Sequence, residues 1–266
     1  MVNVKNNLSL FSCALLNKKK NILIVGYPKS GTNWLSRLVA EVLQCNFNGD
    51  WGFDTKNASR LIFENTNSEY QVFKSHHFFS DIKNASKEPI YKIIYIVRDP
   101  RDIVISGTYF FNFNSLLIKV LNKLSLGFIK SDLSFRKKKK KMINAVLYGD
   151  YKITPWLALS WEKHVTAYIK NDIYIIKYED LLDNTEKEIQ KLIAYLNLNI
   201  ANDQIEKSVK KQCFENRKKE VVTLKHKYLN KLVRKGSQGY WKNNFTEKEK
   251  NLFKEELNNK IEYYSF

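Results

Sequence analysis

Hydrophobic positions gather in four short runs along the chain, at residues 21–27, 70–75, 91–98 and 172–178. Each run is rich in β-branched or aromatic side chains and almost continuous in apolar character, which is typical of parallel strands covered on both faces. Helical patterns lie between the runs, and the first of them, residues 32–45, follows the first run directly. This alternation predicts an α/β fold, a P-loop-like three-layer arrangement in which helices flank a central, mostly parallel β-sheet.

Three local signals mark further helix starts. Thr154-Pro155 offers an N-cap and a first-turn proline for a helix over residues 156–170. The segment T-E-K-E occurs twice, at 185–188 and at 246–249, and each copy has the form of a capping box. We therefore expect helices to begin at all three places.

The chain shows no Pro/Gly/Ser-rich linker and no internal repeat, so we expect a single domain over residues 1–266. Its least regular part is residues 112–148, which include the basic run RKKKKK at 136–141. Residues 112–150 are a candidate insert that covers an acceptor site. The basic run is either a solvated face or a docking surface for an acidic acceptor or an anionic membrane.

The turn after the first hydrophobic run, VGYPKSGTNWLSRL, has the features of an anion-binding loop. Gly26 and Gly31 have the spacing of a nucleotide-triphosphate P-loop, but Lys29 precedes the second glycine instead of following it. Backbone N–H groups at the start of a helix attract an anion, and Gly31 allows its close approach. Ser30 and Thr32 add hydroxyl donors. The alternative is an ordinary strand-to-helix turn that contains a lysine.

Charge narrows the class of partner. The 266 residues include 45 Lys+Arg and 27 Asp+Glu, a net charge of +18, which favours anionic partners such as a nucleotide, an acidic glycan, nucleic acid or a membrane surface. Compositional drift in an AT-rich coding sequence is the competing explanation. The hydrophobic content of 44% is enough for a sizeable core.

Cysteine usage bears on the cellular compartment. Cys13, Cys45 and Cys213 are odd in number and far apart, so they indicate neither a disulfide framework nor a zinc site. This pattern favours a reducing, cytoplasmic location. The longest apolar run near the N-terminus, residues 8–16, is far shorter than the roughly 20 residues that span a bilayer, so we expect a soluble protein.

The segment YPKSGTNWL resembles the 5′-phosphosulfate-binding loop of the cytosolic-type sulfotransferases. Those enzymes transfer a sulfuryl group from 3′-phosphoadenosine 5′-phosphosulfate (PAPS) to an acceptor hydroxyl or amine. The resemblance implies PAPS as donor, no metal, and a Lys29 that reaches the bridging oxygen and the leaving phosphate. It also implies donor contacts from Ser30, Gly31, Thr32 and Asn33, where Asn33 replaces a common hydroxyl residue.

Two further motifs of the family follow in the same order. YIVRDPRDIVISGTYFF (95–111) resembles its 3′-phosphate motif, which implies that Arg98 and Ser106 hold that phosphate, and Ser106 is also assigned to the catalytic set. LVRKGSQGYWKNNFT resembles its C-terminal nucleotide segment, where Arg234, Lys235 and Gly236 would close over the same phosphate. The resemblance extends from about residue 21 to residue 250.

Three aromatic residues match positions that surround the adenine in the family: Trp34, Tyr178 and Phe214. Stacking on a base contributes about 1–3 kcal/mol per residue. Taken one at a time, each of these side chains is better explained by core packing. Their assignment to the nucleotide rests on the family pattern.

The segment VFKSHHFF resembles the family's stretch that carries the catalytic base. His76 falls on the base, Lys74 on the group that steadies the sulfuryl oxygens, and Ser75 replaces a threonine. A neutral imidazole can take the acceptor's proton near pH 7. His77 is the rival base if the register is off by one. A metal held by both histidines is disfavoured because adjacent strand residues point to opposite faces.

The sequence therefore predicts a PAPS-dependent sulfotransferase that acts on a small molecule, lipid or saccharide. Nucleic acid is not an expected partner, contact with anionic surfaces stays open, and so does the oligomeric state, because KNNFTEKEKN departs from the family's dimerisation segment. The alternatives are a nucleotide kinase or ATPase with a degenerate P-loop and a non-enzymatic basic protein that binds nucleic acid or membranes.

Overall fold

The computed structural model describes residues 19–52, 60–63, 67–85, 90–113, 134–223 and 227–257. These residues form two compact units. The first comprises the described residues up to Arg98 and those from His164 to Gln238. The second comprises the residues from Asp99 to Lys163 and those from Gly239 onward. That residues 1–266 act as a single domain stays a prediction.

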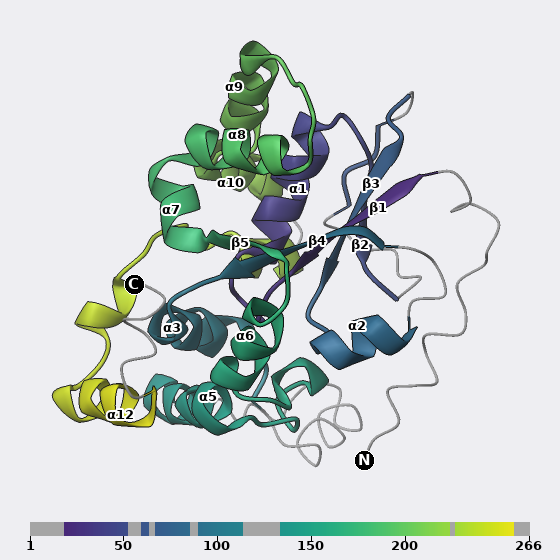
Figure 1. Ribbon diagram of the computed structural model, residues 1–266. Coiled ribbons are helices and arrows are strands. Elements are labelled where there is room, and N and C mark those ends of the chain that lie inside the picture. Colours follow the sequence, from purple (N-terminus) through teal and green to yellow (C-terminus); the bar gives the residue numbers. More distant parts are fainter. Residues whose placement is uncertain are drawn as a thin grey trace, which may run out of the picture. The chain divides into compact units, whose positions relative to one another are not determined.

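The first unit is built on a five-stranded parallel sheet with the strand order β2-β3-β1-β4-β5 (Figure 1). The strands are β1 Lys20–Val25, β2 Phe47–Asp50, β3 Tyr70–Ser75, β4 Ile90–Val97 and β5 Tyr174–Lys177. The fold class is confirmed, and all four hydrophobic runs form strands. The fifth strand, β2, was not predicted. β2 is the outermost strand of the sheet, and its four residues are F-N-G-D. It therefore has no continuous apolar run by which the sequence could reveal it.

Most helices of the first unit are short. They are α1 Thr32–Val42, α2 Phe79–Ala85, α7 Tyr178–Asp183, α8 Thr185–Tyr195, α9 Asn202–Lys211, α10 Phe214–Thr223 and α11 Lys227–Leu232. The helix α6 Trp161–Ile169 enters this unit at His164.

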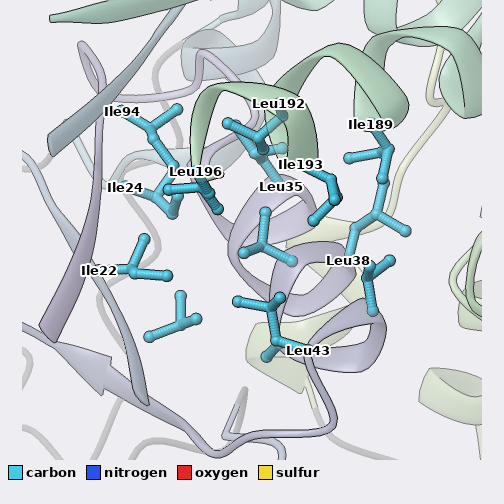
Figure 2. Packing of buried hydrophobic residues seen from close by; sticks show 14 of the residues in the cluster. Ile22, Ile24, Leu35, Leu38, Leu43, Ile94, Ile189, Leu192, Ile193 and Leu196 are labelled. Atoms are coloured by element: carbon cyan, nitrogen blue, oxygen red, sulfur yellow. The ribbon is translucent and has the colours of Figure 1, made fainter. Parts of the chain in front are cut away.

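The core of the first unit lies between the sheet and the pair α1 and α8. In α1 the apolar residues Leu35, Leu38, Val39 and Val42 have i, i+3, i+4, i+7 spacing, so they share one buried face. The same spacing recurs in Ile189, Leu192 and Ile193 of α8 and in Leu196, its C-cap. Figure 2 shows these side chains packed against β1 and β4, with Ile22, Ile24 and Ile94 facing them.

The opposite face of the sheet is covered by α6. Strand side chains alternate between faces, so Tyr95 points away from the face that carries Ile94 and Ile96. Tyr95 contacts His164 and Tyr168 of α6. Figure 1 shows α1 and α6 on opposite sides of the sheet.

The second unit consists of α3 Pro100–Phe110, α5 Phe135–Tyr148, the 3₁₀ turns η2 Pro155–Leu157 and η3 Tyr240–Asn243, and α12 Glu247–Leu257. Asp99 is the N-cap of α3, and its carboxylate accepts from the Arg101 backbone N–H at 2.8 Å. The predicted irregularity of residues 112–148 is wrong where α5 stands, because Ser134 caps a regular helix there. Residues 114–133 of the candidate acceptor-site cover lie outside the described residues.

One of the three predicted helix starts is wrong, and a second helix begins as predicted but without its predicted cap. After Thr154-Pro155 the chain makes only the turn η2, Thr154 makes no capping hydrogen bond, and α6 begins later, at Trp161. Thr185 does not cap α8 either, because its Oγ1 donates to the Leu181 carbonyl 2.8 Å away. The third start is confirmed by α12.

Within the described ranges, no helix combines the length and the apolar character needed to cross a membrane.

Candidate active site

The strand order brings three distant sequence motifs together in the first unit. β1 lies between β3 and β4, and all three strands are parallel, so their carboxyl ends meet at one sheet edge (Figure 1). Gly26 follows β1, His76 follows β3 and Arg98 follows β4. The backbone N–H of Gly26 donates to the Ser75 carbonyl at 3.3 Å, which joins the first two of these segments directly.

The loop between β1 and α1 is tightly packed. Gly31 is the N-cap of α1 with φ 102°, and a Cβ there would lie 2.7 Å from Cδ2 of Tyr178. A Cβ on Gly26 would lie 2.7 Å from the Ile96 carbonyl oxygen. Both positions therefore require glycine. Lys29 also has a left-handed backbone, with φ 76°, which is costly for a residue with a side chain.

Three polar atoms at this loop are buried and have no hydrogen-bond partner among the described residues: Ser30 Oγ, Asn33 Nδ2 and Arg98 Nε. Each such group costs about 1–3 kcal/mol unless an acceptor or donor meets it. All three can donate a hydrogen bond, so an anion bound at the loop fits them. Thr32 is buried as the first residue of α1.

Arg98 connects the loop to the C-terminal motif. Its Nη1 donates to the Lys29 carbonyl at 3.2 Å and its Nη2 donates to the Ser237 carbonyl at 3.0 Å. Its guanidinium carbon lies 4.0 Å from the centroid of the Tyr178 ring, in cation–π contact. Ser237, which directly follows the segment 234–236, therefore lies beside Arg98 at the β1–α1 loop.

Positive charge is concentrated at the loop. Burial, followed by the neighbouring charges of Arg98, Lys74 and Arg234, lowers the pKa of Lys29 from 10.5 to about 7. The side chain of Arg234 is half-buried, and that of Lys235 is exposed. Without an anion, the local field of these cations opposes the charge on Lys29.

The predicted aromatic residues line one side of the same region. The Trp34 ring meets the Tyr178 ring edge-on at 5.8 Å, and its Nε1 donates to the Gln212 carbonyl at 3.2 Å. Phe214 lies against Gly236, where a Cβ would be 2.4 Å from the Phe214 ring. Gly236 also has φ 58°, so both its left-handed backbone and the close Phe214 ring favour glycine at this position.

His76 is held in a defined tautomer. Its Nδ1 lies 2.7 Å from the Gly26 carbonyl oxygen. A carbonyl can only accept, so Nδ1 carries the proton and the basic lone pair of the neutral ring is on Nε2. Burial, followed by the charge of Lys74, lowers the pKa of His76 from 6.5 to about 3, so the ring is neutral at physiological pH.

His77 is bound differently. Its backbone N–H donates to Ser75 Oγ at 3.0 Å, and its Nδ1 lies 2.8 Å from the same oxygen. The side chain is only 3% exposed. His76 therefore contacts the anion-binding loop, whereas His77 is turned back onto the end of β3.

Lys74 forms an ion pair with Asp50 at 2.7 Å and is 6% exposed. Asp50 belongs to β2, and sequence reasoning missed it because that strand gives no periodic signal. The charge of Lys74 nevertheless contributes to the lowered pKa values of both Lys29 and His76.

Ser106 lies in the second unit, half-buried in the middle of α3. In that unit the carboxylate of Asp102 accepts from the backbone N–H of Gly239 at 2.6 Å and of Trp241 at 3.0 Å, and Arg101 stacks on Trp241 at 3.7 Å. The sequence analysis assigned no role to Asp102. Its position in the first turn of the helix that follows R-D-P is the only signal in the sequence that could have drawn attention to it.

No group of three or more His, Cys, Asp or Glu side chains suited to a metal ion occurs among the residues that the structure describes.

Known proteins are similar to this chain over most of its length. The family model described as "Sulfotransferase domain" matches residues 19–263. Sulfotransferase 2A6 of Mus musculus is 29% identical, with 86% of this chain and 80% of the relative aligned. Sulfotransferase 2A1 of the same species is 31% identical over the same shares. The 3-alpha-hydroxysteroid sulfotransferase of Cavia porcellus is 26% identical, covering 87% and 80%.

Two solved structures share the fold. Mouse sulfotransferase SULT7A1 complexed with PAP has a TM-score of 0.64 and 21% identity, over 92% of this chain and 89% of that one. Retinol dehydratase in complex with androsterone and inactive cofactor PAP has a TM-score of 0.58 and 17% identity, over 90% and 80%.

Proposed function

The chain belongs to the sulfotransferase-domain family and transfers a sulfuryl group from PAPS to an acceptor, and on that premise we propose that His76 is the general base of the transfer. We further propose that Lys29 is the cation at the leaving phosphate. The other donor-binding residues that we propose in the first unit belong to the β1–α1 loop, to the end of β4 and to residues 178, 214 and 234–236.

The residues at the loop fit the donor. Ser30 Oγ, Asn33 Nδ2 and Arg98 Nε are buried donors that need acceptors, and the phosphosulfate and the 3′-phosphate provide them. Lys29 to Asn33 would hold the 5′-phosphosulfate, and Arg98 with the 234–236 segment would hold the 3′-phosphate. Bound there, the donor supplies a sulfuryl group attached to a phosphate leaving group. Ser106 of the second unit keeps its assignment to the 3′-phosphate as a prediction.

The observation that carries the assignment of His76 is its hydrogen bond to Gly26. Because Nδ1 donates to the first residue of the loop, Nε2 is the only ring atom that can accept a proton, and the ring is fixed beside the bound anion. His76 can then remove the proton of an acceptor hydroxyl as its oxygen attacks.

Lys29 and Lys74 would stabilise negative charge on different atoms of the reacting group. The partly buried ammonium of Lys29 would gain its full charge as negative charge develops on the leaving phosphate oxygen. Lys74 is held by its ion pair with Asp50 and would stabilise the sulfuryl oxygens through its positive charge. Positioning and electrostatics supply the rate enhancement, and the chain's residues provide both.

We propose a small apolar alcohol as the acceptor. Relatives bear the names 3-alpha- and 3-beta-hydroxysteroid sulfotransferase, and one structural neighbour was solved with androsterone. Lipid or saccharide acceptors and the oligomeric state remain open on these grounds. A cytoplasmic location is proposed from cysteine usage, since Cys45 and Cys213 are both free thiols.

The base is tested by His76→Asn with labelled PAPS and a panel of hydroxysteroids, phenols, fatty alcohols and sugars. An asparagine side chain can still donate to the Gly26 carbonyl but cannot take a proton. We expect turnover to fall by about 10²–10⁴-fold, while the affinity for adenosine 3′,5′-bisphosphate stays within about threefold.

His77→Asn is the matched control, and it should keep turnover within about tenfold of the wild type. Near-normal turnover in the His76 variant, or a larger loss in the His77 variant, would reject the assignment.

A further inference from the structure

A third histidine, His164, is buried beneath the proposed base and has no role in the function described so far. It is 1% exposed and lies on α6. Its Nε2 lies 3.4 Å from the backbone carbonyl oxygen of His76, and its Nδ1 lies 2.9 Å from the hydroxyl of Tyr95. The carbonyl can only accept, so Nε2 carries the proton and Nδ1 accepts from Tyr95. The His76 carbonyl therefore selects the tautomer, and the Tyr95 hydroxyl supports it by donating to Nδ1.

The next turn of α6 makes a second contact of the same kind. The hydroxyl of Tyr168 donates to the backbone carbonyl of His77 at 2.7 Å. The Tyr168 ring stacks on Tyr95 with centroids 4.6 Å apart and 21° between the planes, and on His164 at 5.3 Å. Residues four apart on a helix share one face, so both donors point to the same stretch of chain.

These contacts replace the donors that a strand would provide. β3 ends at Ser75, so the carbonyls of His76 and His77 lie beyond its ladder with β1. His164 also touches Phe78 at 6.0 Å and Tyr27 of the anion loop at 5.6 Å, both edge-on. One buried ring thus packs against both segments that must keep a fixed separation for His76 to act.

We propose that Tyr95, His164 and Tyr168 are positioning residues that hold the backbone of His76 and His77, and through it fix the His76 imidazole against the loop. The proposal rests on the proposed function of His76 as the base. None of the three side chains would touch donor or acceptor. Their effect is on the geometry of proton transfer, where a displacement of about 1 Å can cost about 10²-fold in rate.

Conservative variants test the set without opening a cavity. Tyr95→Phe removes the hydroxyl that donates to His164 Nδ1, and Tyr168→Phe removes the donor to the His77 carbonyl. Tyr70→Phe is the control, because it removes a hydroxyl from a buried tyrosine at the opposite end of β3. We expect kcat to fall by about 10–100-fold in the first two variants and by less than about twofold in the control.

The split between kinetic constants separates positioning from general damage. The KM for PAPS and the affinity for adenosine 3′,5′-bisphosphate should stay within about threefold in all variants, because the loop is intact. His164→Gln should keep most of the activity, since its Nε2 amide can donate to the His76 carbonyl, whereas His164→Leu should lose as much as Tyr95→Phe.

The outcomes are distinguishable from those for the base itself. If His76→Asn is inactive but Tyr95→Phe, Tyr168→Phe and His164→Leu turn over like Tyr70→Phe, the positioning set is rejected and the base stands. Equal losses in His164→Gln and His164→Leu, or nucleotide affinity that falls in parallel with kcat, would also reject it. If His76→Asn itself keeps normal turnover, the proposed base is rejected first.

Discussion

Lys29 shows why single residues at the loop matter more than the spacing of its glycines. Gly26 and Gly31 alone would suit a nucleotide triphosphate, but Lys29 lies inside the loop with a left-handed backbone. Its carbonyl accepts from Arg98, and its ammonium is close to other cations. The sequence could predict that this lysine meets an anion. Its charge state could not be predicted, because it depends on burial and on Arg234, which is 205 residues further along the chain.

The lowered pKa of Lys29 makes nucleotide binding depend on pH. The pKa is about 7 without ligand, and a bound anion raises it. Between pH 7 and 9, binding of adenosine 3′,5′-bisphosphate should therefore take up a proton, and its affinity should fall by up to about tenfold per pH unit. Calorimetry in buffers with different ionisation enthalpies measures both effects.

Lys29→Arg provides the matched control, because a guanidinium stays charged over this range. Its affinity should be nearly constant from pH 7 to 9. An affinity that falls equally in the wild type and in this variant would show that Lys29 is not the titrating group.

At the scale of elements, identical sequences give different structures. At 246–249 the capping box forms: Thr246 N–H donates to Glu249 Oε2 at 2.8 Å, and Glu249 N–H donates to Thr246 Oγ1 at 3.3 Å. At 185–188 it does not form, because Asn184 is the N-cap of α8, and Thr185 is already helical and donates its hydroxyl to the Leu181 carbonyl. Local sequence cannot reveal this difference, since it depends on where the preceding helix ends. The same limit hid β2, which is defined only by its pairing with β3.

The basic run also differs from its sequence-based interpretation. Lys139 is buried, and its Nζ donates to Glu249 at 2.7 Å and to the Asn244 carbonyl at 2.6 Å. A run of six basic residues therefore contains one that joins α5 to the start of α12, while Arg136, Lys137, Lys140 and Lys141 are exposed. These four side chains are exposed, as both interpretations of the run require, whereas Lys139 has a structural role.

Glu249→Gln should destabilise the second unit. Glutamine can still complete the capping box, so the change isolates the ion pair and leaves the Lys139 charge buried. We expect a loss of about 1–3 kcal/mol in the free energy of unfolding, measured by urea titration together with hydrogen exchange of α5 and α12.

Adding Lys139→Met to Glu249→Gln should recover part of that loss, because the unpaired charge is removed with its partner. Lys140→Met, one position along and exposed, should change the stability by less than about 0.5 kcal/mol. A double variant that is less stable than Glu249→Gln alone would contradict this account of the pair.

At the scale of the whole molecule, the strand order explains how distant motifs form one site. The sequence predicted four of the five strands and the ends at which Gly26, His76 and Arg98 lie. It did not predict that β1 stands between β3 and β4, which is what brings these residues to one edge. The tertiary partners Asp50, Asp102 and His164 were also missed, since each acts through contacts between segments far apart in sequence.

The central claim is that this edge binds a nucleotide with anionic groups on both sides of its ribose, and titration calorimetry with adenosine 3′,5′-bisphosphate tests it most directly. We predict saturable binding at one site, at least about tenfold weaker in Arg98→Ala, because a bidentate charge contact is lost. Lys140→Ala, which removes the same charge from the exposed part of α5, should bind like the wild type. No measurable binding by the wild type, or equal affinity in all three proteins, would contradict the account.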